Sequence, residues 1–471
     1  MILPGLLLLV AAQDGGPAPL PGPSPDEVDA VLRALEPQSA AVAAAPAPEL
    51  EVPHADLPPR WWEMVEPVLA LRLRPVVRLG HPTSQRRPEG ALDLRGWVGA
   101  TLHPVPGLSA RLVLAVHPSF PALEAPGPDA LLDGWVEWAY PALGGTVALR
   151  AGRQEIALTE LTWARQDWLQ RPPRFDGATA RLTVGRAFLV AVLAAEALWT
   201  LPVAGEPPDV NVVAALQSGF SDGPGRLLEL HAVLRAPRVA AHGDRTEGLA
   251  TPARLFAGGN AEWTWMGLHG RAALDVEQEQ FERPSVFAPP VVFHAEGGYA
   301  PHFPWAFGAY ASAGARGGLG QPMSWLPGAA GGWSGFDGVA AQDAVPLYGT
   351  VHGAYGEMDL ARSTNAYALF ARAGLVRDRL QDLSFTLWRL AQWDARGAWY
   401  PAAGDSPLLA PGEGRPTPLI GWEADLSARA QLTDHLVLSG AVGLLYAGSR
   451  ARDAQFTSFA QTAWGSLEFR L

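Results

Sequence analysis

The sequence predicts an all-β protein, a single closed antiparallel transmembrane β-barrel of about 18 strands, with roughly 16 as the alternative, preceded by a Pro/Ala-rich tether. Three observations support this fold class. Many segments alternate strictly between apolar and polar residues, and the clearest segment is longer than a typical soluble strand. The mature chain also has no run of about 18 uninterrupted apolar residues. An exported chain without spanning helices crosses a membrane as a closed barrel.

The N-terminal region is expected to lie outside the barrel. Residues 1–12 predict an atypical signal peptide, because the apolar run Leu6–Ala12 ends in small residues while the stretch before it carries no Lys or Arg. Residues 13–65 are rich in Pro and Ala and predict a linker. A short helix is expected at 25–37, with Ser24 as its N-cap and an apolar stripe that a periplasmic partner could bind.

The barrel is expected to span 66–471, and its clearest hairpin is 422–446. Between Trp422 and Leu432 one alternate set is entirely apolar and the other entirely polar. Ten steps of about 3.3 Å, tilted by about 40°, cover roughly 25 Å, which is the height of the apolar band of a transmembrane barrel. Reflecting the chain about Asp434 predicts three cross-strand pairs: Trp422 with Tyr446, Leu426 with Val442, and Leu432 with Leu436. This segment alone leaves a long sandwich hairpin open as the alternative.

Other segments alternate in the same way along the chain: Leu69–Leu73, Leu92–Val98, Leu108–Val116, Val147–Ala151, Ala178–Val184, Leu228–Leu234, Tyr367–Ala373 and Gly465–Leu471. The stretches 187–201 and 383–393 resist assignment of a face. Two connections, 316–346 and 395–419, are long and rich in Gly, Pro and Trp. If the C-terminus is periplasmic, strand parity places both of them outside, where outer-membrane barrels carry their long loops. The alternating C-terminal strand resembles the signal that the barrel-assembly machinery reads.

Arginines opposite the apolar sets are the candidate functional residues. An arginine facing lipid near the bilayer midplane costs about 2–4 kcal/mol, so these side chains are expected to line the lumen. There the planar guanidinium binds carboxylate or phosphate, and rings of arginine favour anions. The set comprises Arg72, Arg74, Arg95, Arg111, Arg150, Arg181, Arg235, Arg372 and Arg429. The alternative is that they pair with lumen acids and stiffen the wall, the acids being Asp93, Glu229, Glu423 and Asp425.

Composition argues against several other classes of function. The net charge of −12 makes a nucleic-acid partner unexpected. Cysteine is absent, so the chain has neither disulfides nor thiolate metal ligands. The sequence contains no HExxH, P-loop or GxSxG motif. We therefore expect no enzyme activity, no cofactor and no metal site.

A resemblance to a known family rests on residues 149–182, which read LRAGRQEIALTELTWARQDWLQRPPRFDGATARL. This segment resembles the alginate-export porin family in eight residues: Gly152, Arg153, Gln154, Trp163, Arg174, Phe175, Asp176 and Gly177. It departs from that family in the stretch IALTELTWARQDW, where a glycine-containing loop is usual. Gln154 and Asp176 are expected where strands meet an external loop, with roles in fixing that loop or in gating the pore.

The resemblance covers 66–471 and has functional implications. It implies an 18-stranded barrel in the bacterial outer membrane, with an arginine-lined pore for an anionic polysaccharide or oligosaccharide. The implied partners are outer-membrane lipid, the barrel-assembly machinery and the anionic sugar polymer or a small solute. Two alternatives stay open, a small-solute or ion porin and a non-conducting structural or enzymatic barrel.

Overall fold

The structure, a computed structural model, describes these residues: 64–81, 90–116, 119–120, 130–159, 161, 174–196, 211–222, 226–237, 254–279, 291–300, 308–319, 357–358, 365–393, 395, 397, 399, 408–409, 412–415 and 417–471. The expected signal peptide 1–12, the linker up to residue 63 and the helix 25–37 lie outside this set. No helix among the described residues is long and apolar enough to cross a bilayer.

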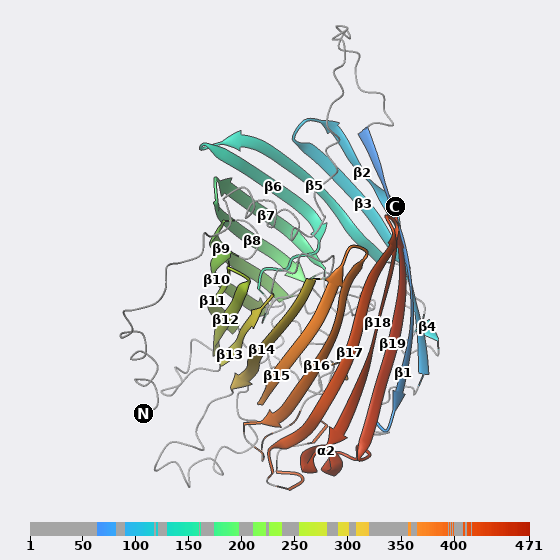
Figure 1. Cartoon of the computed structure of the whole chain (residues 1–471). Coiled ribbons are helices and arrows are strands. Elements are labelled where there is room, and N and C mark those ends of the chain that lie inside the picture. The colour runs from blue at the N-terminus through green and yellow to red at the C-terminus, as the bar shows by residue number, and fades with distance from the viewer. Residues whose placement is uncertain are drawn as a thin grey trace, which may run out of the picture. The chain divides into compact units, whose positions relative to one another are not determined.

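The described strands form one antiparallel sheet that closes on itself (Figure 1). The first half of the sheet comprises β1 (Val65–Leu79), β2 (Gly90–Val105), β3 (Leu108–Val116), β4 (Ser119–Phe120), β5 (Ala130–Ala142), β6 (Gly145–Gln154), β7 (Phe175–Val184), β8 (Ala187–Glu196), β9 (Asn211–Ser221) and β10 (Arg226–Pro237). The second half comprises β11 (Arg254–Trp265), β12 (Leu268–Glu279), β13 (Val291–Tyr299), β14 (Gly308–Leu319), β15 (Ala366–Arg377), β16 (Leu380–Gln392), β17 (Leu419–Thr433), β18 (Leu436–Ala447) and β19 (Phe459–Arg470), with the short helix α2 (Ser449–Asp453) between β18 and β19.

The barrel has 18 strands. The sheet contains 19 strand segments, but β3 and β4 both pair with β2 in one continuous register and act as a single strand. Closure comes from β1, which pairs with β2 on one side and with β19 on the other. The predicted all-β closed antiparallel barrel is therefore confirmed, and 18 strands replaces the alternative of 16.

The two ends of the barrel differ in the length of their connections. At the turn end, two-residue turns join β2 to β3, β5 to β6, β7 to β8, β11 to β12, β15 to β16 and β17 to β18. The long connections all lie at the opposite, loop end, including those after β6, β14 and β16. Figure 1 shows the C-terminus at the turn end and α2 at the loop end. The long connections and the C-terminus therefore lie at opposite ends, as parity predicted. Because outer-membrane barrels have short periplasmic turns, we expect the loop end to be external.

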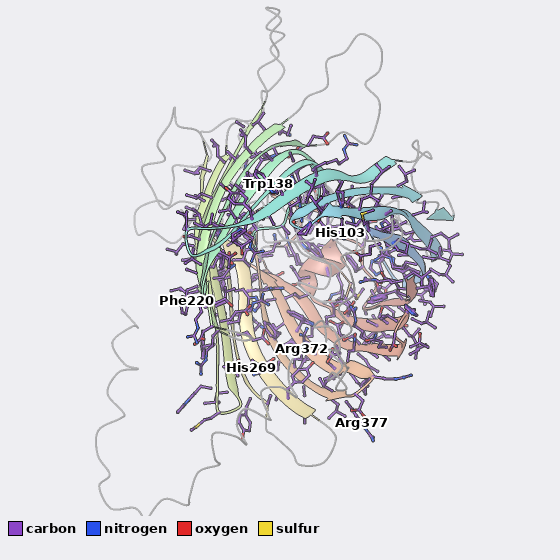
Figure 2. All side chains as sticks on the ribbon, turned by 90° about the horizontal axis from the view of Figure 1, so that it is seen from above. His103, Trp138, Phe220, His269, Arg372 and Arg377 are labelled. Carbon is purple, nitrogen blue, oxygen red and sulfur yellow. The ribbon has the colours of Figure 1, made fainter. Side chains whose placement is uncertain are left out.

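The apolar alternate sets lie on the outside of the barrel. Leu426 is 52% exposed, and the aromatic residues Trp422 and Tyr446 are exposed near the loop end of the same hairpin. Figure 2 shows Phe220 on the outside of the ring of strands and Arg372 on the inside. This outer surface matches the apolar band and aromatic girdle of a barrel in a membrane.

The 422–446 hairpin has nearly the predicted register. Trp422 pairs with Tyr446 and Leu426 pairs with Val442, as predicted. The predicted pairing of Leu432 with Leu436 is wrong, because Thr433 is the partner of Leu436. A bulge between Gln431 and Thr433 adds one residue, so that the two-residue turn Asp434–His435 closes the hairpin.

Two parts of the inner wall are apolar because external connections fold back into the barrel. Ile156, just after β6, packs against a buried cluster that includes Val192 of β8 and Phe256 of β11. Met358, between β14 and β15, packs against a second cluster that includes Trp388 and Leu390 of β16. These contacts explain why 187–201 and 383–393 resist a face assignment. Lipid covers one side of β8 and β16, and protein covers much of the other.

The long connection predicted at 316–346 starts later than expected. Residues 316–319 belong to β14, where Arg316 pairs with Ala368 in the ladder to β15. The second predicted connection, 395–419, ends as β17 begins at Leu419.

Candidate functional site

The nine predicted arginines all lie on the inner face of their strands, since each falls in the set opposite the exposed apolar residues. Six of them lie on the continuous run of strands from β1 to β7, and we name these residues the arginine wall: Arg72, Arg74, Arg95, Arg111, Arg150 and Arg181. Strand register places Arg72 directly opposite Arg95. The remaining three, Arg235, Arg372 and Arg429, lie on β10, β15 and β17. The structure therefore places six of the nine predicted arginines on one run of neighbouring strands and the other three at separate points around the barrel.

Ion pairs hold three guanidinium groups of the arginine wall. The Arg74 Nη2 to Asp93 Oδ2 distance is 2.7 Å. The Arg150 Nη2 to Glu137 Oε2 distance is also 2.7 Å. Arg111 Nε lies 3.3 Å from Asp133 Oδ2. Each acid belongs to a neighbouring strand, so the pairs cross the sheet. The side chains of Arg111 and Arg150 stay about one-third exposed, whereas that of Arg74 is buried.

Indole rings lie beneath several of these cations. The Arg150 guanidinium lies 4.0 Å from the ring centroid of Trp135. The guanidinium groups of Arg95 and Arg72 lie 5.4 and 5.9 Å from the ring of Trp97. Cation–π contact of this kind stabilises an arginine without neutralising its charge. Sequence reasoning did not single out these tryptophans, although each interrupts the polar alternate set of its strand.

The other three predicted arginines have separate partners. Arg235 Nε donates to Glu196 Oε1 at 2.7 Å. Arg372 Nε donates to the hydroxyl of Thr386, and Arg429 Nε donates to the side-chain carbonyl of Gln381. These three arginines therefore bond to other residues of the barrel wall and lie at separate points around it.

Three of the acids expected to pair with arginine have other partners. Glu423 accepts a hydrogen bond from the backbone N–H of Met358 at 2.9 Å, and Asp425 accepts one from Glu357 N at 3.1 Å. Trp388 Nε1 also donates to Asp425 at 2.7 Å. The physical reason is that Glu357 and Met358, which lie between β14 and β15 in the chain, direct their backbone amides to these two acids of β17. Of the four expected acids, Asp93 forms an ion pair with one of the predicted arginines, Arg74.

Glu229, the remaining expected acid, belongs to a buried polar cluster. His231 Nε2 lies 2.7 Å from Asp275 Oδ1, and His231 Nδ1 lies 3.6 Å from Glu229 Oε1. Asn260 Nδ2 donates to Glu229 Oε1 at 3.2 Å. These groups join β10, β11 and β12 across the wall. No group of three or more His, Asp or Glu in the described part of the chain is arranged to hold a metal ion.

The inward connection after β6 contacts the barrel wall at a different place from Met358. Leu158 accepts a hydrogen bond through its carbonyl from Gln217 Nε2 at 2.7 Å, which holds the connection after β6 against β9. Leu161 continues this contact against Ala273 and Val292. Inward connections therefore cover parts of the wall near β8–β13 and near β15–β18, while the arginine wall lies on the strands between them.

The residues that carry the family resemblance meet where β6 and β7 leave the barrel. Arg153 pairs with Asp176 through two hydrogen bonds of 2.8 and 2.6 Å. Gln154 Nε2 donates to the carbonyl of Gly177 at 3.3 Å. Gly152 has a φ of 123°, and a Cβ there would lie 2.2 Å from the carbonyl oxygen of Gly134. These contacts fix the start of the inward connection.

The remaining motif residues extend this junction. Arg174 is buried, with Nε 3.6 Å from Asp133 and Nη1 3.3 Å from Glu155. Phe175 is fully buried in the cluster around Ile156. Trp163 lies outside the described residues. The gating role considered for Gln154 and Asp176 stays a prediction.

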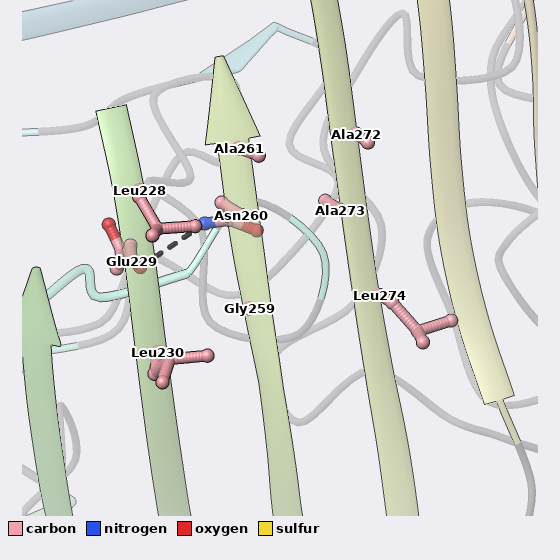
Figure 3. Close-up of a pocket in the computed structure, with 9 residues that line it drawn as sticks. All are labelled: Leu228, Glu229, Leu230, Gly259, Asn260, Ala261, Ala272, Ala273 and Leu274. Carbon is pink, nitrogen blue, oxygen red and sulfur yellow. Dashed lines mark hydrogen bonds between the residues drawn. The ribbon is translucent and has the colours of Figure 1, made fainter. Parts of the chain in front are cut away.

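A shallow depression of about 220 Å³ lies over β10, β11 and β12 (Figure 3). Its lining is mostly apolar and includes Leu228, Leu230 and Leu274, which face lipid, around Gly259. Its two polar lining residues, Glu229 and Asn260, bond to each other within the buried polar cluster, so we take the lumen as the candidate site.

Comparison with known proteins supports the fold. No protein-family model and no curated protein matches the sequence. Similar solved structures include OccD3 (OpdP) of Pseudomonas aeruginosa, with a TM-score of 0.53 and 11% identity over 87% of this chain and 92% of that chain. OccAB1 of Acinetobacter baumannii has a TM-score of 0.53 and 9% identity over 87% and 97%. OpdK of Pseudomonas aeruginosa with vanillate has a TM-score of 0.51 and 12% identity over 87% and 99%.

At identities this low, the structural similarity shows the fold alone and does not identify the solute. The resemblance to alginate-export porins gains no support from these comparisons. The apolar outer band, the closed sheet and the similarity to solved porins together make this chain an 18-stranded β-barrel of the bacterial outer membrane.

Proposed function

We propose that the protein is a passive outer-membrane channel for small anionic solutes. The arginine wall carries this proposal, because six arginines lie along one side of the lumen between two regions that inward connections cover. A guanidinium in a narrow aqueous passage attracts carboxylates and can bind them through two parallel hydrogen bonds. The proposal replaces the polysaccharide passage expected from the sequence with its small-solute alternative.

The inward connections support a small solute over a polymer. A polymer needs an open path along the whole lumen, whereas Ile156 and Met358 each sit inside the barrel within a packed cluster. The solved structure of OpdK with vanillate offers a precedent for a small solute in a barrel of this fold.

The ion pairs of the arginine wall limit the expected preference for anions over cations. Arg74, Arg111 and Arg150 each have a carboxylate beside them, so the net positive potential is smaller than the number of arginines suggests. At Arg111 and Arg150, whose side chains are about one-third exposed, a permeating carboxylate competes with the fixed one for guanidinium donors. This exchange favours weak binding and rapid release, which conduction requires.

The proposal is tested by single-channel recording of the purified barrel in planar bilayers. We expect a preference for anions, permeation by small carboxylates across a concentration gradient, and no passage of alginate oligomers. Passage of alginate oligomers would restore the polysaccharide channel. A folded barrel without conductance would indicate a structural or enzymatic barrel instead.

A further inference from the structure

One cation on the outer surface of the barrel differs from the others. Arg389 of β16 lies in the outward set, opposite Leu369 of β15 and Trp422 of β17. Three other arginines at or near the outer surface have an acid close by: Arg153 with Asp176 at 2.6 Å, Arg226 with Asp222 at 3.5 Å, and Arg377 with Asp378 at 3.7 Å. Among the described residues no acid pairs with Arg389.

The contacts of Arg389 leave donors available. Its Nη1 donates to the hydroxyl of Tyr367 at 3.3 Å, and its guanidinium carbon lies 5.9 Å from the ring centroid of the same tyrosine. A guanidinium carries five N–H donors in a planar fork, so a single hydrogen bond leaves most of them without a partner in the described part of the chain. The remaining N–H donors of Arg389 can therefore bind an anion that is not part of the protein.

The height of Arg389 in the membrane follows from β16. Nine residue steps separate Leu380, next to the turn end, from Arg389. At about 3.3 Å per step and a tilt of about 40°, the Cα of Arg389 lies roughly 23 Å above the start of the strand. The apolar band is about 25 Å tall, so Arg389 lies at its outer edge. Phe385 and Leu387, which precede Arg389 on the same face, are exposed to lipid.

Aromatic side chains surround Arg389 at this level. The ring of Trp393 packs 4.5 Å from the ring of Tyr367, and Trp393 and Trp422 are both more than two-fifths exposed. Tyr446 lies beside Trp422 on the next strand. Tryptophan and tyrosine gather where the acyl chains meet the headgroups. The anion available to Arg389 at this height is therefore a lipid headgroup.

We propose that Arg389, with Tyr367 and Trp422 beside it, binds a phosphate of lipid A in the outer leaflet. The guanidinium donates to two phosphate oxygens, and the neighbouring aromatic rings pack against the sugar and the first carbons of the acyl chains. This site lies outside the lumen, and its assignment is independent of the solute that the channel passes.

The test is native mass spectrometry of the purified full-length barrel titrated with bisphosphorylated lipid A. We expect Arg389→Gln to weaken the apparent affinity about tenfold, as the loss of a charge-assisted contact predicts. Binding of fully dephosphorylated lipid A should stay the same in the variant and in the original protein. The variant should fold, because it removes a charge from the lipid face, and a heat-modifiability gel checks this. Arg389→Lys keeps the charge without the fork and should weaken binding less.

Arg377→Gln is the matched control, because it removes the same charge from the turn end and should leave affinity unchanged. An equal loss of affinity in Arg377→Gln would mean that total surface charge, and not a site at Arg389, determines binding. Unchanged affinity in Arg389→Gln would overturn the assignment. Inorganic phosphate at the concentration of the lipid should fail to displace it. Displacement under that condition would mean a site for free anions rather than for a lipid.

Discussion

The charged side chains of the lumen have partners across the sheet rather than along the chain. Arg150 and Glu137 face each other from β6 and β5, and the Arg150 guanidinium also lies on the ring of Trp135. Both members of the pair are about one-quarter to one-third exposed, so water screens their attraction. The pair therefore contributes more to the position of charge in the pore than to stability.

The first residue-scale prediction concerns this pair. Glu137→Gln should shift the reversal potential toward anions and Arg150→Gln should shift it toward cations, because each leaves the partner's charge unbalanced. A unit charge a few ångströms from a permeating ion is worth about 1 kcal/mol in water-like surroundings, or about a fivefold change in permeability ratio. The double variant should return close to the original value. Shifts in the same direction for both single variants would contradict the assignment.

The second residue-scale prediction concerns the lipid face. Leu426→Arg places a charge on the exposed apolar side of β17 and should cost about 2–4 kcal/mol or block assembly. Ser427→Arg places the same charge on the inner face and should lose little more than the hydrogen bond between Ser427 and Ser384, about 1 kcal/mol. Heat-modifiability gels measure the folded fraction of each. Equal behaviour of the two variants would mean that the faces are assigned wrongly.

At the scale of elements, the described residues of the connection between β16 and β17 pack against the short helix α2. The helix α2 holds the connection between β16 and β17 through Arg450, whose side chain is fully buried. Its guanidinium donates to the side chain of Gln392 and to the carbonyls of Gly397 and Glu413. One side chain thus satisfies an acceptor at the end of β16 and two carbonyls of the connection that follows it.

The element-scale prediction follows from this arrangement. Arg450→Met should destabilise the packing of the connection by about 3–5 kcal/mol, because it leaves buried acceptors unpaired. Limited proteolysis should then cut the connection while the barrel keeps its gel shift. Arg415→Met is the control, since Arg415 belongs to the same connection and is 74% exposed, so its loss should change little. Equal protection of both variants would show that Arg450 does not hold the connection.

At the scale of the whole molecule, orientation in the membrane can be tested with two glycines. Gly412 lies in a long connection at the loop end and Gly144 in a two-residue turn at the turn end, and nothing crowds either position within 4 Å. An epitope tag inserted at Gly412 should be accessible on intact cells. A tag at Gly144 should become accessible after the outer membrane is opened. The reverse result would mean that the loop end faces the periplasm.

Selectivity is the second prediction at this scale. Changing Arg111, Arg150 and Arg181 together to Gln should move the reversal potential toward cations by more than any single change, because the potential in a pore sums over its charges. Arg74 is left in place because it is buried against Asp93, and its removal would leave a buried acid without its cation. An unchanged anion preference in the folded triple variant would exclude the arginine wall as its source.

Local patterns in the sequence determined the strands and their faces. Alternation depends only on neighbours along the chain, so it was enough to predict an all-β barrel, the pairing of Trp422 with Tyr446 and the inward placement of all nine arginines. The bulge at Leu432 was not predicted, because one extra residue does not change the composition of a strand in a recognisable way.

The tertiary structure alone decided what fills the lumen. Parity states that Glu423 and Asp425 face inward, but their hydrogen-bond partners come from Glu357 and Met358, more than sixty residues earlier in the chain. Which strands the inward connections contact likewise depends on packing between segments that are far apart in the sequence. Contacts between segments far apart in the sequence depend on closure of the whole barrel, and an alternating pattern within one strand carries no information about them.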